Sequence, residues 1–211
     1  GHRLHLMPPP SSGGLIIASS LKIFDLMKID TYPALSTEEF HTIAEVLKVN
    51  FRNRNLLGDP KFNKNPLSSF LDSSENKKWA KKINQNKSLK LDPHRFKKNW
   101  KESKQTTHLS VLDSKGNGVS MTITLNGVFG SKMVSEKYGI ALNNEMDDFT
   151  TRPGEANLFG LVQGDANLVR AGARPLSSMS PTLVSRNGQL VMALGAPGGP
   201  RIITGVLQTL Y

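Results

Sequence analysis

Residues 106–130 read "TTHLSVLDSKGNGVSMTITLNGVFG", and this stretch decides the fold class of the chain. The segment 107–113 is rich in β-branched and apolar residues and predicts a strand, whereas 114–118 has the composition of a turn. Polar and apolar side chains then alternate from Val119 to Asn126, as they do in a strand with one solvated face. The stretch therefore predicts two strands joined by a turn.

The sequence before this stretch has helical patterns. An apolar run at 15–27 follows Ser11-Ser12, a good N-terminal cap, and predicts a mostly buried helix. Ser36 and Glu39 have the spacing of a capping box, which predicts a second helix starting there. A weaker polar pattern at 74–84 predicts a third helix.

The sequence after it returns to strands and ends in a helix. Asn187-Gly188 predicts a hairpin turn between two strands, the second at 190–194. The glycine-rich loop 195–199 precedes Pro200 and a helical pattern at 201–211. Helices first, strands next and a helix last predict an α+β fold with mainly antiparallel sheets.

The net charge of +10 over 211 residues comes from one segment. Residues 48–104 hold 16 Lys and Arg against 5 Asp and Glu, and the rest of the chain is nearly neutral. This favours a solvated basic connector over a nucleic-acid groove, because the segment has few aromatic residues and no nucleic-acid-binding motif. No apolar run is long enough to predict a membrane span.

The chain has no cysteine, which excludes disulfides and thiolate metal sites. The five histidines match no metal-binding spacing, so we predict neither a metal site nor a cofactor.

Several residues have the chemistry of an amide-cleaving site. A threonine such as Thr106 becomes a nucleophile when it is the first residue of a chain, because its own α-amine accepts the hydroxyl proton. The acids of 145–148 could hold an ammonium group, and the hydroxyls of Ser177 and Ser178 a carboxylate. The loop 195–199 could donate amides to a phosphate or to an oxyanion. Each feature also has a structural explanation: the start of a strand, surface acids, a turn and the entry to a helix.

Six segments together resemble the γ-glutamyltranspeptidases (glutathione hydrolases) of the N-terminal nucleophile hydrolase superfamily. They occur in the order and at the separations of that family: "PPPSSGG" (8–14), "TTHLSV" (106–111), "TLNGVFGS" (124–131), "LNNEMDDF" (142–149), "RPLSSMSPT" (174–182) and "GAPGGPRIIT" (195–204). The resemblance implies part of an αββα four-layer sandwich. It also implies that residues 1–105 are the end of a large subunit, with a basic connector at 48–105, and that 106–211 are the start and core of a small catalytic subunit.

The resemblance also implies a reaction. The precursor would cleave itself between Gln105 and Thr106, and Thr106 would then attack the γ-glutamyl amide of a compound such as glutathione. Water, an amino acid or a dipeptide would resolve the acyl-enzyme. By match of motif, the implied roles are orientation of Thr106 by Thr124, binding of the α-amino group by Asn126, Glu145 and Asp148, binding of the α-carboxylate by Ser177 and Ser178, and an oxyanion hole formed by Gly198 and Gly199.

The resemblance further implies a heterodimer of large and small subunits, and a periplasmic, extracellular or cell-surface location for the whole protein. The family's arginine that pairs with the glutamyl carboxylate belongs to sequence preceding Leu4, and no arginine here has a matching context. A sheet without its neighbouring strands is expected to expose apolar faces and to associate or pack differently. Two alternatives stay open: a non-catalytic basic module for nucleic acid or an anionic surface, and a related glutaryl or poly-γ-glutamyl acylase.

Overall fold

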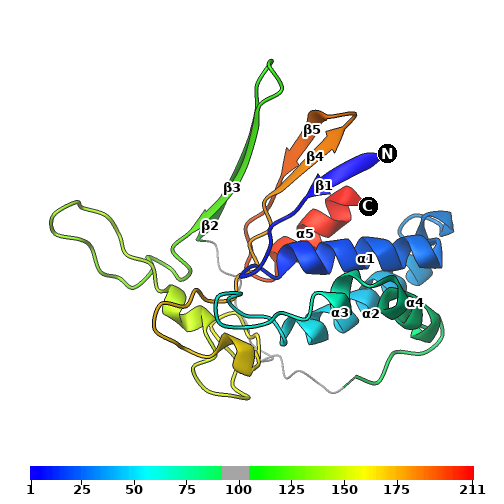
Figure 1. Ribbon diagram of the computed structural model, residues 1–211, viewed down its shortest axis with the longest axis horizontal. Helices are drawn as coiled ribbons and strands as arrows, with labels where there is room; N and C mark the ends of the chain where they lie inside the picture. Colours follow the sequence, from blue (N-terminus) through cyan, green and yellow to red (C-terminus); the bar gives the residue numbers. More distant parts are fainter. Residues whose placement is uncertain (92–104) are drawn as a thin grey trace.

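The computed structural model describes residues 1–91 and 105–211, and Figure 1 shows the arrangement of their helices and strands. The C-terminal part of the predicted basic connector, 92–104, lies outside the described residues. The described part of the chain is a mixed α and β structure whose sheets are antiparallel, as the sequence predicted. None of its helices is long and apolar enough to cross a membrane.

The four predicted helices are present in the described residues, as α1 Gly13–Met27, α2 Thr37–Arg54, α4 Ser73–Lys82 and α5 Arg201–Leu210. The short helix α3 Ser68–Leu71 and 3-10 turns at Ile29–Thr31, Glu145–Asp148 and Asp165–Asn167 were not predicted. The cap of α2 forms as predicted, because the Ser36 hydroxyl accepts from the amide of Glu39. The cap of α1 does not: Ser12 makes no side-chain cap bond, and its hydroxyl is used elsewhere.

The strands within residues 1–91 and 105–211 form two sheets (Figure 1). The first has the order β1 (His2–His5), β4 (Thr182–Arg186) and β5 (Gln189–Leu194), and the second is the hairpin of β2 (Thr106–Leu112) and β3 (Gly118–Thr124). Asn187 and Gly188 between β4 and β5 have φ values of 51° and 83°. Positive φ at both positions is typical of the two-residue hairpin turn that their sequence predicted. Strand β1 was not predicted.

The apolar core lies where α1, α2 and α5 meet. Ile16, Val46 and Ile203 come from these three helices and are fully buried. Side chains of this kind each stabilise the fold by about 1.5–3 kcal/mol when they leave water. Helices from before and after residue 106 therefore share one core.

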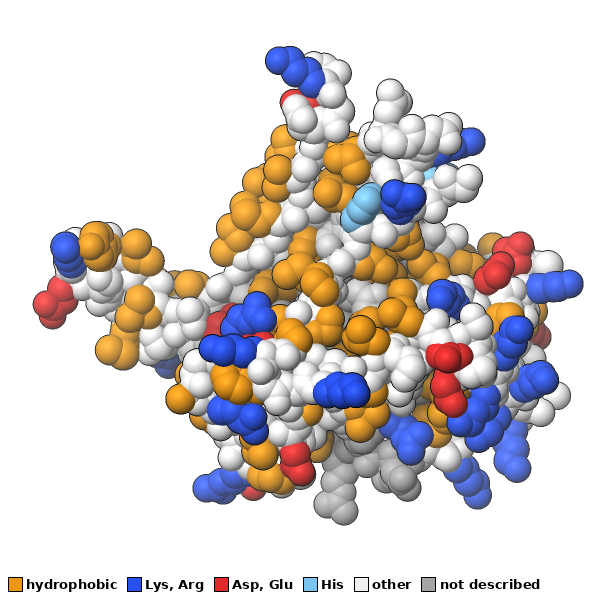
Figure 2. Space-filling model, viewed as in Figure 1, with side chains coloured by type: hydrophobic (Ala, Val, Ile, Leu, Met, Phe, Trp, Pro, Cys, Tyr) orange, Lys and Arg blue, Asp and Glu red, His pale blue; other side chains and the backbone are white. Residues whose placement is uncertain are grey.

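The hairpin β2–β3 exposes the face that an ordinary half-buried strand pair would bury. Its apolar side chains are exposed, with Val119 at 52% and Ile123 at 57%, and Figure 2 shows orange side chains along this hairpin. Its polar side chains face the other sheet instead: the Ser120 hydroxyl donates to the carbonyl of Leu194 and accepts from the amide of Thr182. The apolar face is thus the solvated one, in agreement with the expected exposure of apolar sheet surface.

Candidate active site

The hairpin places two threonine hydroxyls side by side. Thr106 is the first residue of β2 and Thr124 the last of β3, and the antiparallel register pairs them directly. The Thr106 hydroxyl donates to the Thr124 hydroxyl over 3.1 Å, and Thr106 is only 9% exposed. The hydroxyl of Thr106 is therefore oriented by a neighbour on the adjacent strand.

The chain then turns sharply at Asn126. This residue has φ of 70°, which is uncommon for a residue other than glycine and is tolerated best by asparagine and aspartate. Its amide donates to the Thr124 hydroxyl over 2.9 Å, and its side-chain amide donates to the carbonyl of Asn144 over 3.2 Å. Asn126 thereby joins the end of β3 to the acidic turn 145–148.

Of the three acidic side chains in the turn 145–148, two line the site and one does not. Asp147 accepts from the amide of Leu158, outside the cavity described below. Glu145 and Asp148 line that cavity. Burial raises the pKa of Glu145, and burial together with the Glu145 carboxylate raises the pKa of Asp148 well above its ordinary range, while Arg54 opposes this rise. Two half-buried carboxylates that interact with each other favour a shared proton or a bound cation such as an ammonium group.

The serine pair is held by the N-terminal segment. The amide of Ser177 donates to the carbonyl of Pro10 over 2.8 Å. Its carbonyl accepts from both the amide and the hydroxyl of Ser12, each over 2.9 Å. The hydroxyl predicted to cap α1 therefore anchors the loop that carries Ser177 and Ser178.

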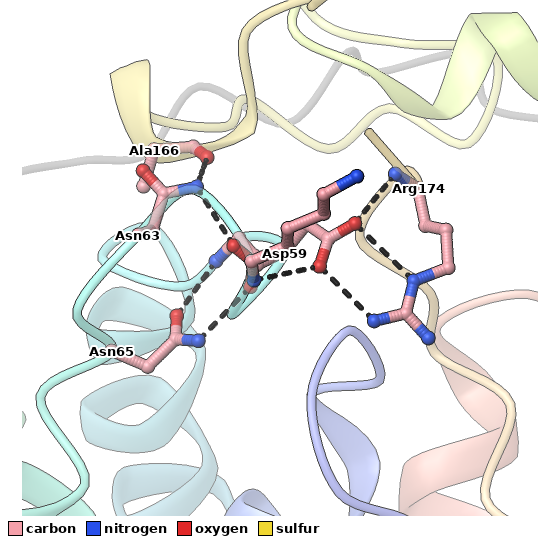
Figure 3. A network of polar contacts seen from close by, with 7 residues as sticks. Asp59, Asn63, Asn65, Ala166 and Arg174 are labelled. Carbon is pink, nitrogen blue, oxygen red and sulfur yellow. Dashed lines mark hydrogen bonds and ion pairs between the residues drawn. The ribbon is translucent and has the colours of Figure 1, made fainter. Parts of the chain in front are cut away.

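An ion pair between the buried Asp59 and the largely exposed Arg174 fixes the same loop from its other end (Figure 3). Asp59 is 2% exposed, and its carboxylate accepts from the backbone amide, Nε and Nη2 of Arg174 over 2.8, 3.2 and 3.0 Å. It also accepts from the amide of Lys61. These charge-assisted bonds hold the pKa of Asp59 well below its usual range, chiefly through Arg174. Only two residues separate Arg174 from Ser177.

The glycine-rich loop enters α5 beside these groups. Gly198 and Gly199 have φ values of 120° and 56°, which favour glycine. A Cβ at Gly199 would lie 2.9 Å from the ring of Phe159, so the close approach of that ring also requires glycine. Gly199 lines the cavity, whereas Gly198 is buried and is not among the lining residues.

One open cavity brings most of the predicted site residues together. It is lined by the following predicted residues: Thr106, Thr124, Asn126, Glu145, Asp148, Ser177, Ser178 and Gly199. Hydroxyls, paired carboxylates and a helix entry thus face one space from segments distant in the sequence. Their catalytic and binding roles stay predictions. Within residues 1–91 and 105–211, no group of three His, Cys, Asp or Glu side chains is placed to hold a metal ion.

Sequence reasoning missed two polar residues of the site, Arg54 and Gln163. Arg54 ends α2, lines the cavity and is 2% exposed. It donates to Gln163, which in turn donates from its side-chain amide to the carbonyl of Asp148. Burial lowers the pKa of Arg54 to about 10, and Asp148 opposes this. The signal that could have found Arg54 is its spacing, since it continues the buried face of Val46 and Asn50 at intervals of four residues.

The chain belongs to the gamma-glutamyltranspeptidase family, whose sequence model matches residues 1–211. It is 44% identical, over 99% of its length, to a protein of Escherichia coli strain K12 named "Glutathione hydrolase proenzyme". It is 42% identical, over its whole length, to a protein of the same name from Pseudomonas sp. strain A14. The chain spans 36% and 37% of these two relatives.

A likeness to a solved structure supports the fold. The whole chain superposes on 35% of a cephalosporin acylase from Bacillus halodurans with a TM-score of 0.71, at 20% sequence identity. At this identity the likeness shows the fold alone. The two-sheet, helix-flanked arrangement is therefore one that a divergent sequence also adopts.

Proposed function

We propose that the whole protein containing this chain is a γ-glutamyltransferase and glutathione hydrolase with Thr106 as its nucleophile. The observation that carries the proposal is the convergence on one cavity of the Thr106 and Thr124 hydroxyls, the Glu145 and Asp148 carboxylates and the Ser177-Ser178 pair. Family membership at over 40% identity supports the same conclusion.

Maturation comes first: hydrolysis of the bond between Gln105 and Thr106 adds water to the Gln105 carbonyl carbon and frees the α-amine of Thr106. The new α-amine accepts the Thr106 hydroxyl proton, and Oγ1 attacks the γ-carbonyl carbon of the substrate. The carbonyl electron pair moves to oxygen, where amides of the Gly198-Gly199 loop stabilise it. Collapse expels the amine, which takes the proton, and leaves a γ-glutamyl ester on Thr106. Water gives glutamate, whereas the amine of an amino acid or dipeptide gives a new γ-glutamyl amide.

The charges of the cavity define the substrate class. In this proposal Glu145, Asp148 and Asn126 bind the α-ammonium of the glutamyl group, and Ser177 and Ser178 donate to its α-carboxylate. A glutaryl amide has no ammonium to balance the two acids, so the acid pair favours γ-glutamyl compounds over glutaryl ones. Glutathione is the γ-glutamyl compound that the names of the relatives indicate.

The proposal includes the arrangement of the whole protein. Residues 1–105 would be the end of a large subunit and 106–211 the start and core of a small one, within an αββα sandwich. The two subunits would remain together as a heterodimer. We further propose a periplasmic, extracellular or cell-surface location.

Mass spectrometry of the purified whole protein tests the proposal. We expect two polypeptides separated before Thr106 and release of p-nitroaniline from γ-glutamyl-p-nitroanilide. Thr106→Ala should abolish both, because alanine offers no hydroxyl. Thr106→Ser should keep both at a reduced rate, because it retains one. A single intact chain with full activity, or an active Thr106→Ala variant, would refute the assignment.

A further inference from the structure

We propose that Arg54 is a positioning residue that organises both ends of the substrate-binding cavity. In this view its guanidinium directs the Ser178 hydroxyl toward the substrate carboxylate and fixes the acidic turn that receives the α-amino group. The inference rests on the proposed function and adds to it a role for a residue outside the six family-like segments.

The first argument is the burial of the charge. Arg54 is 2% exposed at the end of α2, and a guanidinium is rarely removed from water without a compensating structure. An apolar side chain of similar size would fill the same position without that desolvation penalty. The burial of a cation at the wall of the cavity therefore points to a use for its donors.

The second argument is where the donors point. Nε donates to the Ser12 hydroxyl over 3.0 Å, and Nη1 donates to Oε1 of Gln163 over 2.8 Å. Nη2 lies 3.4 Å from the carbonyl of Leu176 and 3.3 Å from the Ser178 hydroxyl oxygen. These four acceptors are neutral and come from three separate segments. Arg54 thus joins the N-terminal segment, the serine loop and the segment that carries Gln163.

The contact with Arg54 determines where the hydroxyl hydrogen of Ser178 points. A serine hydroxyl that accepts a bond from Arg54 still has its own hydrogen to donate. Because Ser178 lines the cavity, that hydrogen is available to a carboxylate bound there. Arg54 therefore converts Ser178 into a donor for the substrate.

The contact with Gln163 reaches the opposite end of the cavity. Because Oε1 accepts from Arg54, the side-chain NH₂ of Gln163 must face away, and it donates to the carbonyl of Asp148 over 2.7 Å. The charged groups that act on the Asp148 carboxylate are Glu145 and Asp147 from its own turn and Arg54 from α2. Cleavage before Thr106 would add an α-amine in the same cavity. Among the described residues, Arg54 is thus a cation that offsets the repulsion within the acidic turn.

The test compares three substrates in the whole protein: γ-glutamyl-p-nitroanilide, 4-aminobutyryl-p-nitroanilide, which lacks the α-carboxylate, and glutaryl-p-nitroanilide, which lacks the α-amino group. For Arg54→Met we expect KM for the γ-glutamyl substrate to rise about tenfold or more, with kcat within about threefold, since a bond to a charged group is lost at each end. The increase should be clearly smaller for each truncated substrate, because one end no longer contributes. Arg52→Met, on the same helix and outside the cavity lining, is the matched control and should match the wild type.

The pH profile gives a second readout. Without the Arg54 charge the acidic pair keeps its proton to higher pH, so the fall in KM that accompanies deprotonation should move to higher pH. If Arg54→Met does not fold, Arg54→Gln provides the same comparison, because glutamine also removes the charge while keeping a polar side chain. An equal loss on all three substrates, a pure kcat effect or an unmoved pH profile would overturn the proposal. A wild-type protein that neither cleaves itself nor turns over γ-glutamyl amides would instead refute the proposed function.

Discussion

The ion pair between Asp59 and Arg174 gives the sharpest prediction about stability (Figure 3). Asp59→Asn keeps the shape of the side chain, removes its charge and turns an NH₂ group toward donors. Two of the four bonds to the carboxylate are then lost, and the other two are made to a neutral oxygen. Bonds to a charged group contribute about 1.5–3 kcal/mol each, but the Arg174 side chain is 63% exposed, which weakens its share. We expect a local destabilisation of about 2–3 kcal/mol.

Hydrogen–deuterium exchange of the whole protein measures this directly. The amides of Lys61 and Arg174 donate to Asp59, so peptides covering them should exchange roughly 30- to 150-fold faster in the variant. Asp25→Asn, an exposed position on α1, should leave both peptides unchanged. Equal exchange of Asp59→Asn and wild type would show that the ion pair contributes nothing, and the reasoning would fail.

The same variant makes a prediction about pH with a defined sign. The pKa of Asp59 is depressed in the folded protein, so its stabilisation is fully present above the unfolded pKa of about 3.9 and is lost as the pH falls through the folded value. The difference between wild type and Asp59→Asn should therefore be constant from about pH 5 to 8 and shrink only in strong acid. A difference that already disappears near pH 5 would contradict this assignment.

Two further predictions concern the hairpin. Thr124→Val removes the acceptor of both the Thr106 hydroxyl and the Asn126 amide. It should slow p-nitroaniline release from γ-glutamyl-p-nitroanilide by about 10- to 100-fold, whereas the rate of Thr124→Ser should stay within about threefold of the wild type. Equal rates for the two variants would exclude an orienting hydroxyl. Ser120→Ala removes the hydrogen bonds that join the hairpin to Leu194 and Thr182. Hydrogen exchange should show the protection of the Thr182 amide weakened by about 1–3 kcal/mol. Unchanged protection would show that other contacts hold the two sheets together.

The sequence predicted best where local chemistry determines structure. The Ser36 cap and the Asn187-Gly188 turn depend on a few neighbouring residues, and both form as expected. Strand β1 was missed because four residues carry too little periodicity to stand out. The alternation in β3 predicted two faces but could not say which of them meets the rest of the protein.

The residues of the candidate site likewise fall into those that the sequence could predict and those that it could not. Family-like motifs supplied most of the residues that line the cavity, although sequence alone could not show that they meet. Asp147 belongs to the same acidic turn yet points to Leu158, because the direction of a side chain depends on local backbone turns. Arg54 was missed because its meaning depends on Ser178, which lies 124 residues further along the chain. Only the folded structure brings the two together.

The pairing of β1 with β4 means that cleavage before Thr106 would change how the stability of the protein depends on its concentration. The ladder pairs residues 2–5 with residues 183–186, on opposite sides of the proposed cleavage site. Once the bond before Thr106 is broken, this ladder and the packing of α1 on α5 become an interface between two polypeptides. Unfolding then includes dissociation, so the apparent stability of the mature protein should depend on its concentration, whereas that of the uncut precursor should not.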